Sequence, residues 1–482
     1  MAATVEEKSR VESLPILRES LPGSPELVRK VDHFVSEFPW NGPDRYRPKI
    51  YRQRREELMA NLPSNAPLLV AGGKEFTRNL DVEFPFRQES DFYYLTGFDE
   101  PDAAAIIEYS RYTLIVRPRD PEKEQWTGYR AGTEGAKKNY EATHAHPSDE
   151  LTATIEAVCK EAKKVFFIPA VANTALNEKI QTILKSTGVE CVDVSDRVHK
   201  LRLVKTPYEI ALLKQANIIT WKGHVSAMVD GKLTREMMER DPKHARGRNE
   251  GEIRASLESA FTRGGAPRVA YPSIVASGAN GTILHYVANN AYAQPGDLVL
   301  IDAACEYGYQ GADVTRTWPV SGRFTPEQRA IYEIVLNVQK TGIEATRSGA
   351  TIEEIHDHCA RLLTASLVEL GIMKGNVDKL VEAKTYRQFF PHSIGHFLGM
   401  DVHDVCGEKD QGAYKQVKLE PGMVITIEPG IYIKKDDETV DPKWRGIAVR
   451  LEDNIVVTEG DPINLSGETP KEVDEVEAIM NG

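Results

Sequence analysis

Short apolar runs alternate with amphipathic stretches along the first 195 residues. The runs of strand length are residues 68–73, 112–120, 165–170 and 189–194, and the stretches of helical character are residues 47–62, 151–163 and 175–186. This alternation is typical of an α/β domain with a largely parallel sheet. We therefore expect an N-terminal arm with one short helix at residues 1–44, followed by an α/β domain at residues 45–195.

The segment 77–108 of this first half is dense in aromatic residues. We interpret most of them as core residues on strands, because buried aromatic side chains dominate protein cores. The half contains neither a GxGxxG nor a GxxxxGK[ST] motif, so no phosphate-binding loop is indicated. The first domain is expected to serve as scaffold and specificity surface.

After a predicted linker at residues 196–205, the pattern changes to long capped helices interleaved with apolar strands. Three helix starts have threonine as N-cap and an acidic or amide residue three positions later: TPYE at 206–209, TPEQ at 325–328 and TIEE at 351–354. Such capping boxes satisfy the free N–H groups at a helix start. We expect an α+β domain at residues 206–465 and a short polar tail at residues 466–482. The charged segment 237–251 is interpreted as a solvated loop without function.

Composition and charge exclude several classes of function. The 482 residues include 27% charged and 41% hydrophobic ones, and the net charge is −12. No basic block exists that could follow nucleic-acid phosphates, and no apolar run is long enough to span a membrane. The five cysteines are widely spaced without a CxxC pair, and the N-terminus resembles neither a signal nor a transit peptide. We therefore expect no disulfide framework and a cytoplasmic location.

Four carboxylates stand where the chain should be buried. Asp302 ends an apolar strand, and Asp313 follows after a Gly-rich return. Glu428 ends another apolar strand before a Pro–Gly turn, and Glu452 lies between two apolar segments. Buried carboxylates are costly unless they are paired or bound to metal. Acids on separate strands together with a histidine-rich loop indicate a metal site.

That loop is HSIGHFLGMDVHDV, with His392, His396 and His403. Four carboxylates and one histidine form a donor set that suits Mn²⁺-like ions, with Zn²⁺, Co²⁺ and Fe²⁺ also open. Such a set fits two ions about 3.5–4 Å apart. Gly395 and Gly399 are expected to let backbone and substrate approach closely, so that a bulky residue there would affect activity more than folding.

The ordered set Asp302, Asp313, His396, Glu428 and Glu452 resembles the five ligands of the pita-bread dinuclear metallopeptidases. The flanking sequences GANGTILHY, PHSIGHFLGMDVHDV and RGIAVRLEDNIVVTEG, with RNLDVEFPFRQESDFYYLTGFDEPDA in the first half, resemble the aminopeptidase P and prolidase branch. The resemblance spans residues 45–465. It implies an aminopeptidase P-type α/β N-terminal domain and an α+β pita-bread catalytic domain.

The resemblance also implies roles for individual residues. Asp302 and Asp313 would hold one divalent ion, expected to be Mn²⁺, with Asp313 bridging to a second. His396 would bind that second ion, and Glu428 and Glu452 would bridge or complete both coordination shells.

Five further residues match positions that assist catalysis in this family. His285 matches a histidine near the scissile bond, and His392 and His403 match a substrate-contacting pair. Arg450 and Tyr432 match residues that stand beside the metal-binding acids.

The expected substrates are peptides with proline at the second position, and the family is often dimeric, which suggests a homodimer. Xaa-Pro aminopeptidases release the first residue from longer peptides, whereas prolidases cut only dipeptides. The loop at residues 407–418 has lysines but no arginine, unlike many prolidase relatives. This loop and the first-half segments favour the aminopeptidase, although FFPHSIGHFLG has prolidase character.

Three other classes of protein share part of this pattern. A pita-bread binding module without metal is disfavoured because all five ligand positions are filled. A methionine aminopeptidase is disfavoured by the large first domain. Hydrolysis of other amide-like or phosphoester bonds stays open as a side activity.

Overall fold

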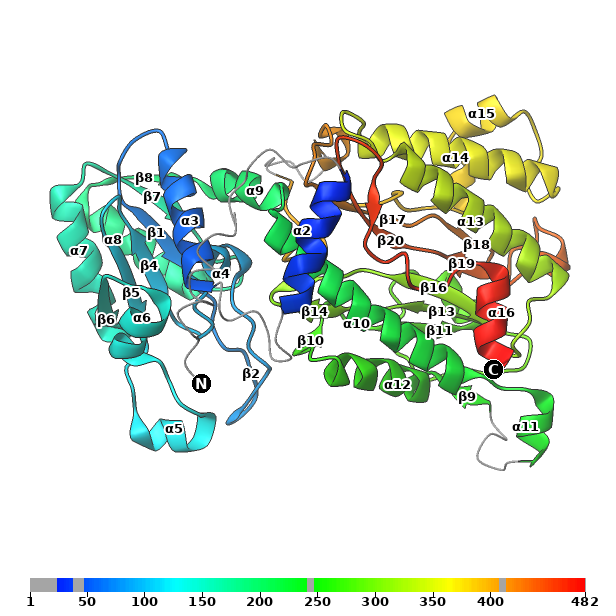
Figure 1. Ribbon diagram of the computed structural model, residues 1–482, viewed down its shortest axis with the longest axis horizontal. Coiled ribbons are helices and arrows are strands. Elements are labelled where there is room, and N and C mark those ends of the chain that lie inside the picture. The colour runs from blue at the N-terminus through cyan, green and yellow to red at the C-terminus, as the bar shows by residue number, and fades with distance from the viewer. Residues whose placement is uncertain (1–23, 38–46, 241–246, 407–412, 482) are drawn as a thin grey trace. The chain divides into compact units, whose positions relative to one another are not determined.

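The computed structural model describes residues 24–37, 47–240, 247–406 and 413–481. The chain forms two compact units: Pro43–Arg202 is the smaller, and Met1–Gly42 together with Leu203–Gly482 forms the larger (Figure 1). Within the described ranges, every helix is too short or too polar to cross a lipid bilayer.

The smaller unit is built on a six-stranded sheet with the order β6-β5-β4-β1-β7-β8. Its strands are β1 (Leu68–Ala71), β4 (Ala104–Ile107), β5 (Tyr112–Val116), β6 (His144–Pro147), β7 (Lys164–Ile168) and β8 (Glu190–Asp193). β4 runs antiparallel to both β1 and β5, while β1–β7, β7–β8 and β5–β6 are parallel. The sheet is therefore mixed, whereas a largely parallel sheet was expected. The difference arises between β4 and β5, where the Glu108 N–H donates to the Arg111 carbonyl and closes a tight turn that makes the two strands a hairpin.

Helices and a small hairpin complete the smaller unit. They are α3 (Arg47–Ala60), β2 (Thr77–Asn79), β3 (Val82–Glu83), α4 (Ser90–Thr96), α5 (Pro121–Thr127), α6 (Gly132–Tyr140), η2 (Ser148–Glu150), α7 (Leu151–Glu161), α8 (Thr174–Thr187) and α9 (Ser195–Leu203). Phe92, Tyr93 and Tyr94 are buried as expected, but on helix α4 and not on a strand. Gly97 ends that helix in the left-handed conformation, with φ of 65°. The segment assigned to a linker largely forms α9.

Helices of the larger unit follow the predicted starts. They are α2 (Ser24–Glu37), α10 (Pro207–Gly231), α11 (Arg235–Arg240), α12 (Glu250–Arg263), α13 (Pro326–Ala345), α14 (Ile352–Glu369), α15 (Val377–Glu382) and α16 (Val473–Asn481). The capping boxes at Thr206, Thr325 and Thr351 are all confirmed. In the predicted solvated loop 237–251, residues 241–246 lie outside the described residues. At its end Glu250 is fully buried, which corrects that interpretation.

Strands of the larger unit lie between α10 and α12 on one side and α13 and α14 on the other (Figure 1). One sheet joins β11 (Ile274–Ser277), β13 (Leu298–Asp302) and β16 (Thr315–Pro319), another joins β17 (Val424–Ile427), β20 (Asp453–Val456) and β21 (Ile463–Asn464), and β18 (Gly430–Tyr432) pairs with β19 (Ala448–Arg450). Shorter pairings involve β9 (Arg248–Asn249) with β12 (Tyr292–Ala293), and β10 (Arg268–Val269), β14 (Cys305–Tyr307) and β15 (Gln310–Gly311).

The C-terminal segment, expected as a polar tail, packs into the larger unit. Val476 and Met480 of α16 are buried. Just before this helix, Lys471 pairs with Asp453, which also accepts a hydrogen bond of 2.7 Å from Arg316. Arg316 and Asp453 are both fully buried. Lys471, which makes the segment look polar in the sequence, is a partner in this buried network. The backbone carbonyls of Thr469 and Pro470 belong to it as well, because they accept hydrogen bonds from Arg316.

Candidate metal centre

Strand register brings the four predicted acids to one place in the larger unit. Asp302 at the end of β13 pairs with Thr315 of β16. Ile427 pairs with Asp453 in antiparallel fashion, so the adjacent Glu428 and Glu452 lie side by side. The Glu452 N–H donates to the Thr315 carbonyl at 3.1 Å, which joins the two sheets at the acids.

The histidine-rich loop is fixed against β17. Thr426 accepts the His396 N–H on its hydroxyl at 3.1 Å and donates its own N–H to the His396 carbonyl at 2.9 Å. A Cβ at Gly395 would lie 1.9 Å from the Thr426 carbonyl oxygen, and one at Gly399 would lie 2.1 Å from the Asp404 carboxylate. These glycines therefore permit close packing within the protein, so larger residues there should disturb the loop itself and not only substrate approach.

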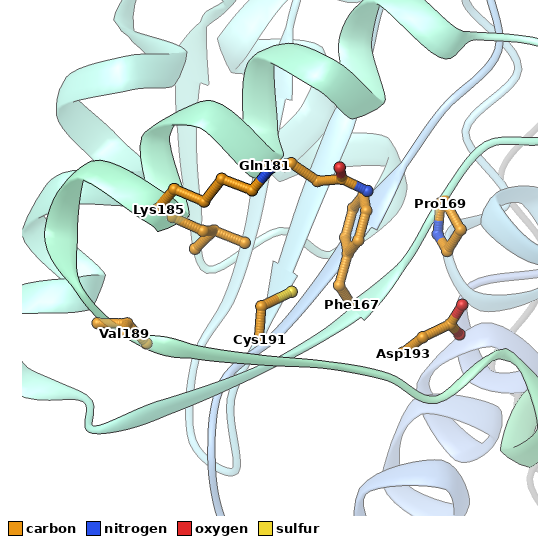
Figure 2. Close-up of a pocket in the computed structure, with 8 residues that line it drawn as sticks. Phe167, Pro169, Gln181, Lys185, Val189, Cys191 and Asp193 are labelled. Carbon is orange, nitrogen blue, oxygen red and sulfur yellow. The ribbon is translucent and has the colours of Figure 1, made fainter.

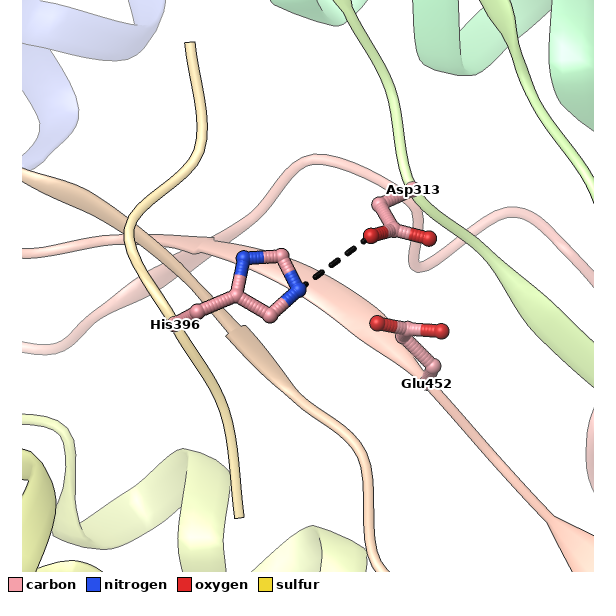
Figure 3. Close-up of side chains that lie close together, drawn as sticks. All are labelled: Asp313, His396 and Glu452. Carbon is pink, nitrogen blue, oxygen red and sulfur yellow. Dashed lines mark ion pairs between the residues drawn. The ribbon is translucent and has the colours of Figure 1, made fainter. Parts of the chain in front are cut away.

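Asp313, His396 and Glu452 converge, with one ligand atom from each within 4.8 Å of the others (Figure 3). His396 Nε2 lies 3.3 Å from Asp313 Oδ2 and 3.6 Å from Glu428 Oε1. Asp302 joins the group through Tyr271, whose hydroxyl lies 2.6 Å from Asp302 Oδ1 and 2.7 Å from Asp313 Oδ1. Three of the five predicted ligands thus converge directly, and the other two adjoin them, Glu428 beside His396 and Asp302 through Tyr271.

A chain of hydrogen bonds leads from this centre to His392. Arg450 donates to Asp302 at 2.8 Å and to the Tyr432 hydroxyl at 3.0 Å. The Tyr432 hydroxyl lies 2.8 Å from His392 Nε2, and His392 Nδ1 lies 2.8 Å from the Ser393 carbonyl oxygen. Because that carbonyl can only accept, Nδ1 carries the hydrogen and Nε2 accepts from Tyr432. Burial lowers the pKa of His392 to about 3, so the ring is neutral.

The other two predicted histidines, His403 and His285, are not among the three residues that converge. His403 packs edge-on against His396, with ring centroids 4.4 Å apart. Burial, with contributions from His396 and His285, lowers the pKa of His403 to about 4. His285 is exposed on the segment that follows η4 (Gly278–Thr282).

The electrostatics of the acids fit a bound cation. Burial and repulsion from Asp302 raise the pKa of Asp313 well above its ordinary value. Burial and neighbouring carboxylates likewise raise the pKa values of Glu428 and Glu452. Divalent cations relieve this cost, because they replace repulsion among carboxylates with attraction to a shared charge.

The metal-stripped protein should therefore lose stability as pH rises. The folded chain binds protons on the acids that the unfolded chain releases near the ordinary pKa values of 3.8 for Asp and 4.5 for Glu. The stabilisation from these protonated acids is complete below the ordinary values and is lost as pH rises through the raised ones, at about 1.4 kcal/mol per pH unit and group at most.

Burial lowers the pKa values of His392 and His403, so these histidines make the folded protein less stable as pH falls below 6.5. This effect is opposite to that of the acids, so the contribution of the acids is measured as a difference between two variants. Urea unfolding of metal-stripped wild type and Asp313→Asn at several pH values cancels the histidine contribution. The stability advantage of Asp313→Asn over wild type should grow with pH. A difference that is constant with pH would contradict the assignment.

The sequence did not single out several side chains that hold these acids. Thr315 donates its hydroxyl to Glu452 at 2.7 Å, and the Asn454 side-chain oxygen accepts the Asp313 N–H at 3.0 Å. Tyr271 and Thr426 complete this group. Thr315 and Asn454 stand two residues after predicted ligands and Thr426 stands two residues before Glu428, which is the one local signal these three offer. Nothing in the sequence around Tyr271 distinguishes it.

A pocket of about 300 Å³ lies in the smaller unit, between α8 and the strands β7 and β8 (Figure 2). Its lining includes Phe167, Lys185, Cys191 and Asp193, and no residue of the predicted site. Burial raises the pKa of the Cys191 thiol, which disfavours its thiolate. The candidate chemistry is therefore in the larger unit.

Comparisons with known proteins agree with this geometry. Residues 211–459 match metallopeptidase family M24, and residues 51–167 match the aminopeptidase P N-terminal domain. The chain is 40% identical over 438 residues to the Xaa-Pro aminopeptidase of Haemophilus influenzae, covering 89% of this chain and 97% of the relative. It is 38% identical to the Xaa-Pro aminopeptidase of Escherichia coli over 89% and 97% of the two chains.

Solved structures give the same result. The structure of Pseudomonas aeruginosa aminopeptidase PepP superposes with a TM-score of 0.84 at 39% identity, covering 91% of this chain and 99% of that one. Zinc-substituted E. coli aminopeptidase P in complex with product has a TM-score of 0.82 at 37% identity, covering 90% and 98%. The larger unit therefore has the pita-bread fold of a metal-dependent peptidase. With its N-terminal match and these relatives, the chain belongs to the aminopeptidase P family, the Xaa-Pro aminopeptidases of metallopeptidase family M24.

Proposed function

We propose that this chain removes the N-terminal residue from peptides whose second residue is proline, with two divalent ions held by Asp302, Asp313, His396, Glu428 and Glu452. The observation that carries the proposal is the convergence of Asp313, His396 and Glu452, with one ligand atom of each within 4.8 Å of the others. Glu428 beside His396 and Asp302 beside Tyr271 support the rest of the set. The relatives, which are named Xaa-Pro aminopeptidases, supply the substrate class.

Five donors of this kind suit two hard ions, and Mn²⁺ is our proposal for both because carboxylate oxygens dominate the set. Asp302 and Asp313 would hold one ion and His396 the other. Asp313 would bridge, and Glu428 and Glu452 would bridge or complete both coordination shells. When bound, the two ions would make water acidic enough to supply a hydroxide nucleophile near neutral pH and would polarise the scissile carbonyl.

The chain's own residues orient and balance this charge. The Tyr271 hydroxyl, which has one hydrogen to donate, lies against one oxygen of Asp302 and one of Asp313 and so orients both carboxylates. Arg450 offsets part of the negative charge through Asp302 and holds the Tyr432 hydroxyl against His392. Neighbours of this kind set the orientation and basicity of metal ligands.

Three histidines are proposed to contact the peptide. His392 is held in one tautomer by Ser393 and Tyr432, so it presents a fixed, neutral ring. His392 and His403 would position the peptide and help to stabilise negative charge on the tetrahedral intermediate, and His285 would stand near the scissile bond. A substrate bond before proline lacks an N–H and has a fixed φ, so recognition must rest on shape and on contacts to other groups.

Product analysis with a panel of peptides tests the proposal. Metal-stripped protein reloaded with Mn²⁺ should release the first residue from an Xaa-Pro-Pro-Xaa peptide, as followed by mass spectrometry. The same peptide with alanine at the second position is the matched control and should be cut at least about a hundredfold more slowly. Cleavage restricted to Gly-Pro and Ala-Pro would instead identify a prolidase. The loop that favours the aminopeptidase lies partly outside the described residues, at 407–412, so this assay decides on length preference.

The expected homodimer and cytoplasmic location stay predictions from the sequence. Light scattering of the purified chain would test the first.

A further inference from the structure

The segment that carries His285 is organised around one buried carboxylate, that of Glu250. Glu250 is the first residue of α12 and has no exposed surface. The segment leaves β11 at Ser277, passes through η4 and His285, and returns at Ala291 just before β12. Glu250 contacts this segment at its entry, at two points within it and at its exit.

The two carboxylate oxygens divide these contacts. Oε1 accepts hydrogen bonds from the Ser277 N–H at 2.8 Å, the Ser277 hydroxyl at 2.7 Å and the Asn280 amide at 3.1 Å. Oε2 accepts from the Tyr286 hydroxyl and from the Ala291 N–H, each at 2.9 Å. The Glu250 N–H also donates to the Ala291 carbonyl at 3.0 Å. Tyr286 directly follows His285 in the sequence.

All five donors to the carboxylate are neutral groups. A buried carboxylate is costly unless hydrogen bonds satisfy its lone pairs, and hydrogen bonds to an ionised acceptor are roughly twice as strong as neutral ones. A surface loop of this length would ordinarily be mobile. Here a single acceptor of five hydrogen bonds ties it to α12 and to the end of β11, which pairs with the Asp302-bearing strand β13.

We propose that Glu250 is a positioning residue for the peptidase reaction, which acts by fixing the segment 277–291 so that His285 stays where it can contact the substrate. The inference rests on the proposed function, since it takes the role of His285 from there. It assigns a part in the reaction to a residue that stands in a segment first interpreted as a solvated loop.

Glutamine cannot replace this carboxylate. An ionised carboxylate offers only acceptors, whereas an amide replaces one oxygen with an NH₂ group. In either amide orientation the NH₂ group would face hydrogen-bond donors from Ser277 or from Tyr286 and Ala291. Glu250→Gln keeps the size of the side chain and breaks the network, so it should raise hydrogen exchange of peptides from 277–291 about tenfold or more. Glu252→Gln, an exposed position on the same helix, is the matched control and should leave the exchange unchanged.

A double-mutant cycle tests whether the network acts through His285. In Mn²⁺-loaded protein, Glu250→Gln should lower kcat for an Xaa-Pro-Pro-Xaa peptide about tenfold or more with little change in KM. In the His285→Ala background the same substitution should have no further effect, because coupled residues are not additive. An equal fold-loss in both backgrounds, or unchanged kcat and exchange for Glu250→Gln, would overturn the proposal.

Two further measurements keep the test decisive. If Glu250→Gln does not fold, Tyr286→Phe removes one of the five hydrogen bonds and enters the same cycle, with the same outcomes expected at smaller size. Failure of the wild type itself to cleave the peptide would overturn the proposed function and the catalytic part of the inference. Hydrogen exchange would then still show whether Glu250 orders the segment.

Discussion

Asp313→Asn is expected to lower kcat/KM for an Xaa-Pro peptide by at least about a thousandfold, because it removes a charged ligand shared by both proposed ions. Metal ions contribute several kcal/mol of transition-state stabilisation, and each tenfold in rate corresponds to about 1.4 kcal/mol. The amide keeps the size of the side chain and can still accept from Tyr271. The loss should therefore reflect metal binding and catalysis, with the fold intact. Steady-state kinetics on Mn²⁺-loaded protein measures it.

The stability of the metal-stripped protein should change in the opposite direction for the same substitution. Burial and Asp302 disfavour the ionised Asp313 carboxylate, so a neutral amide should make the stripped protein more stable. Asp436→Asn, at an exposed position, is the matched control and should affect neither property. Retained activity in Asp313→Asn would contradict the ligand assignment. The contradiction would be clearest if the metal-stripped Asp313→Asn protein were also less stable than the wild type.

Asp453→Ala is expected to reduce the free energy of unfolding by about 3–5 kcal/mol, the usual cost of leaving a buried charge without its partner. Asp453 pairs with Arg316 and Lys471, and its oxygens also accept from Ser466 and Asn464. These charges outweigh burial and hold the pKa of Asp453 well below its ordinary value. The stabilisation is thus present above about pH 3.8 and is lost as pH falls towards the depressed pKa.

Urea denaturation near neutral pH measures this effect against Asp461→Ala. Asp461 also pairs with an arginine, Arg347, but its side chain is 90% exposed. Exposed pairs contribute about 0–1 kcal/mol. Similar small losses for both variants would show that the C-terminal segment is not held by the buried network. Because Arg316 also donates to the Glu452 carbonyl at 2.7 Å, Asp453→Ala should lower activity as well.

Local sequence features predicted the elements that carry the site. The capping boxes at Thr206, Thr325 and Thr351 depend on residues three positions apart, so a short stretch of sequence specifies them. Asp302 and Glu428 were found because a charge at the end of an apolar strand is costly. The five-residue set and the family followed from these positions.

Features that depend on distant partners were not predicted. β4 is antiparallel to its neighbours because of the turn at Glu108–Arg111. The effect of this turn on the sheet appears only when all six strands assemble. Tyr271 contacts Asp302 and Asp313 across strands, and no nearby residue indicates this. Glu250 and Lys471 are charged residues in polar stretches, so the local composition predicted that both side chains are exposed to solvent. Their burial results from hydrogen-bond donors and charges that other segments bring to them.

Five side chains of the larger unit are proposed to hold two divalent ions that enable Xaa-Pro cleavage. A titration of metal-stripped protein with Mn²⁺ tests this, when bound metal and the rate of first-residue release from an Xaa-Pro-Pro-Xaa peptide are measured together. We predict that both reach a plateau at two ions per chain, and that Asp313→Asn binds fewer ions and stays inactive. Full activity in metal-stripped protein, or two tightly bound ions in Asp313→Asn with wild-type activity, would contradict the claim.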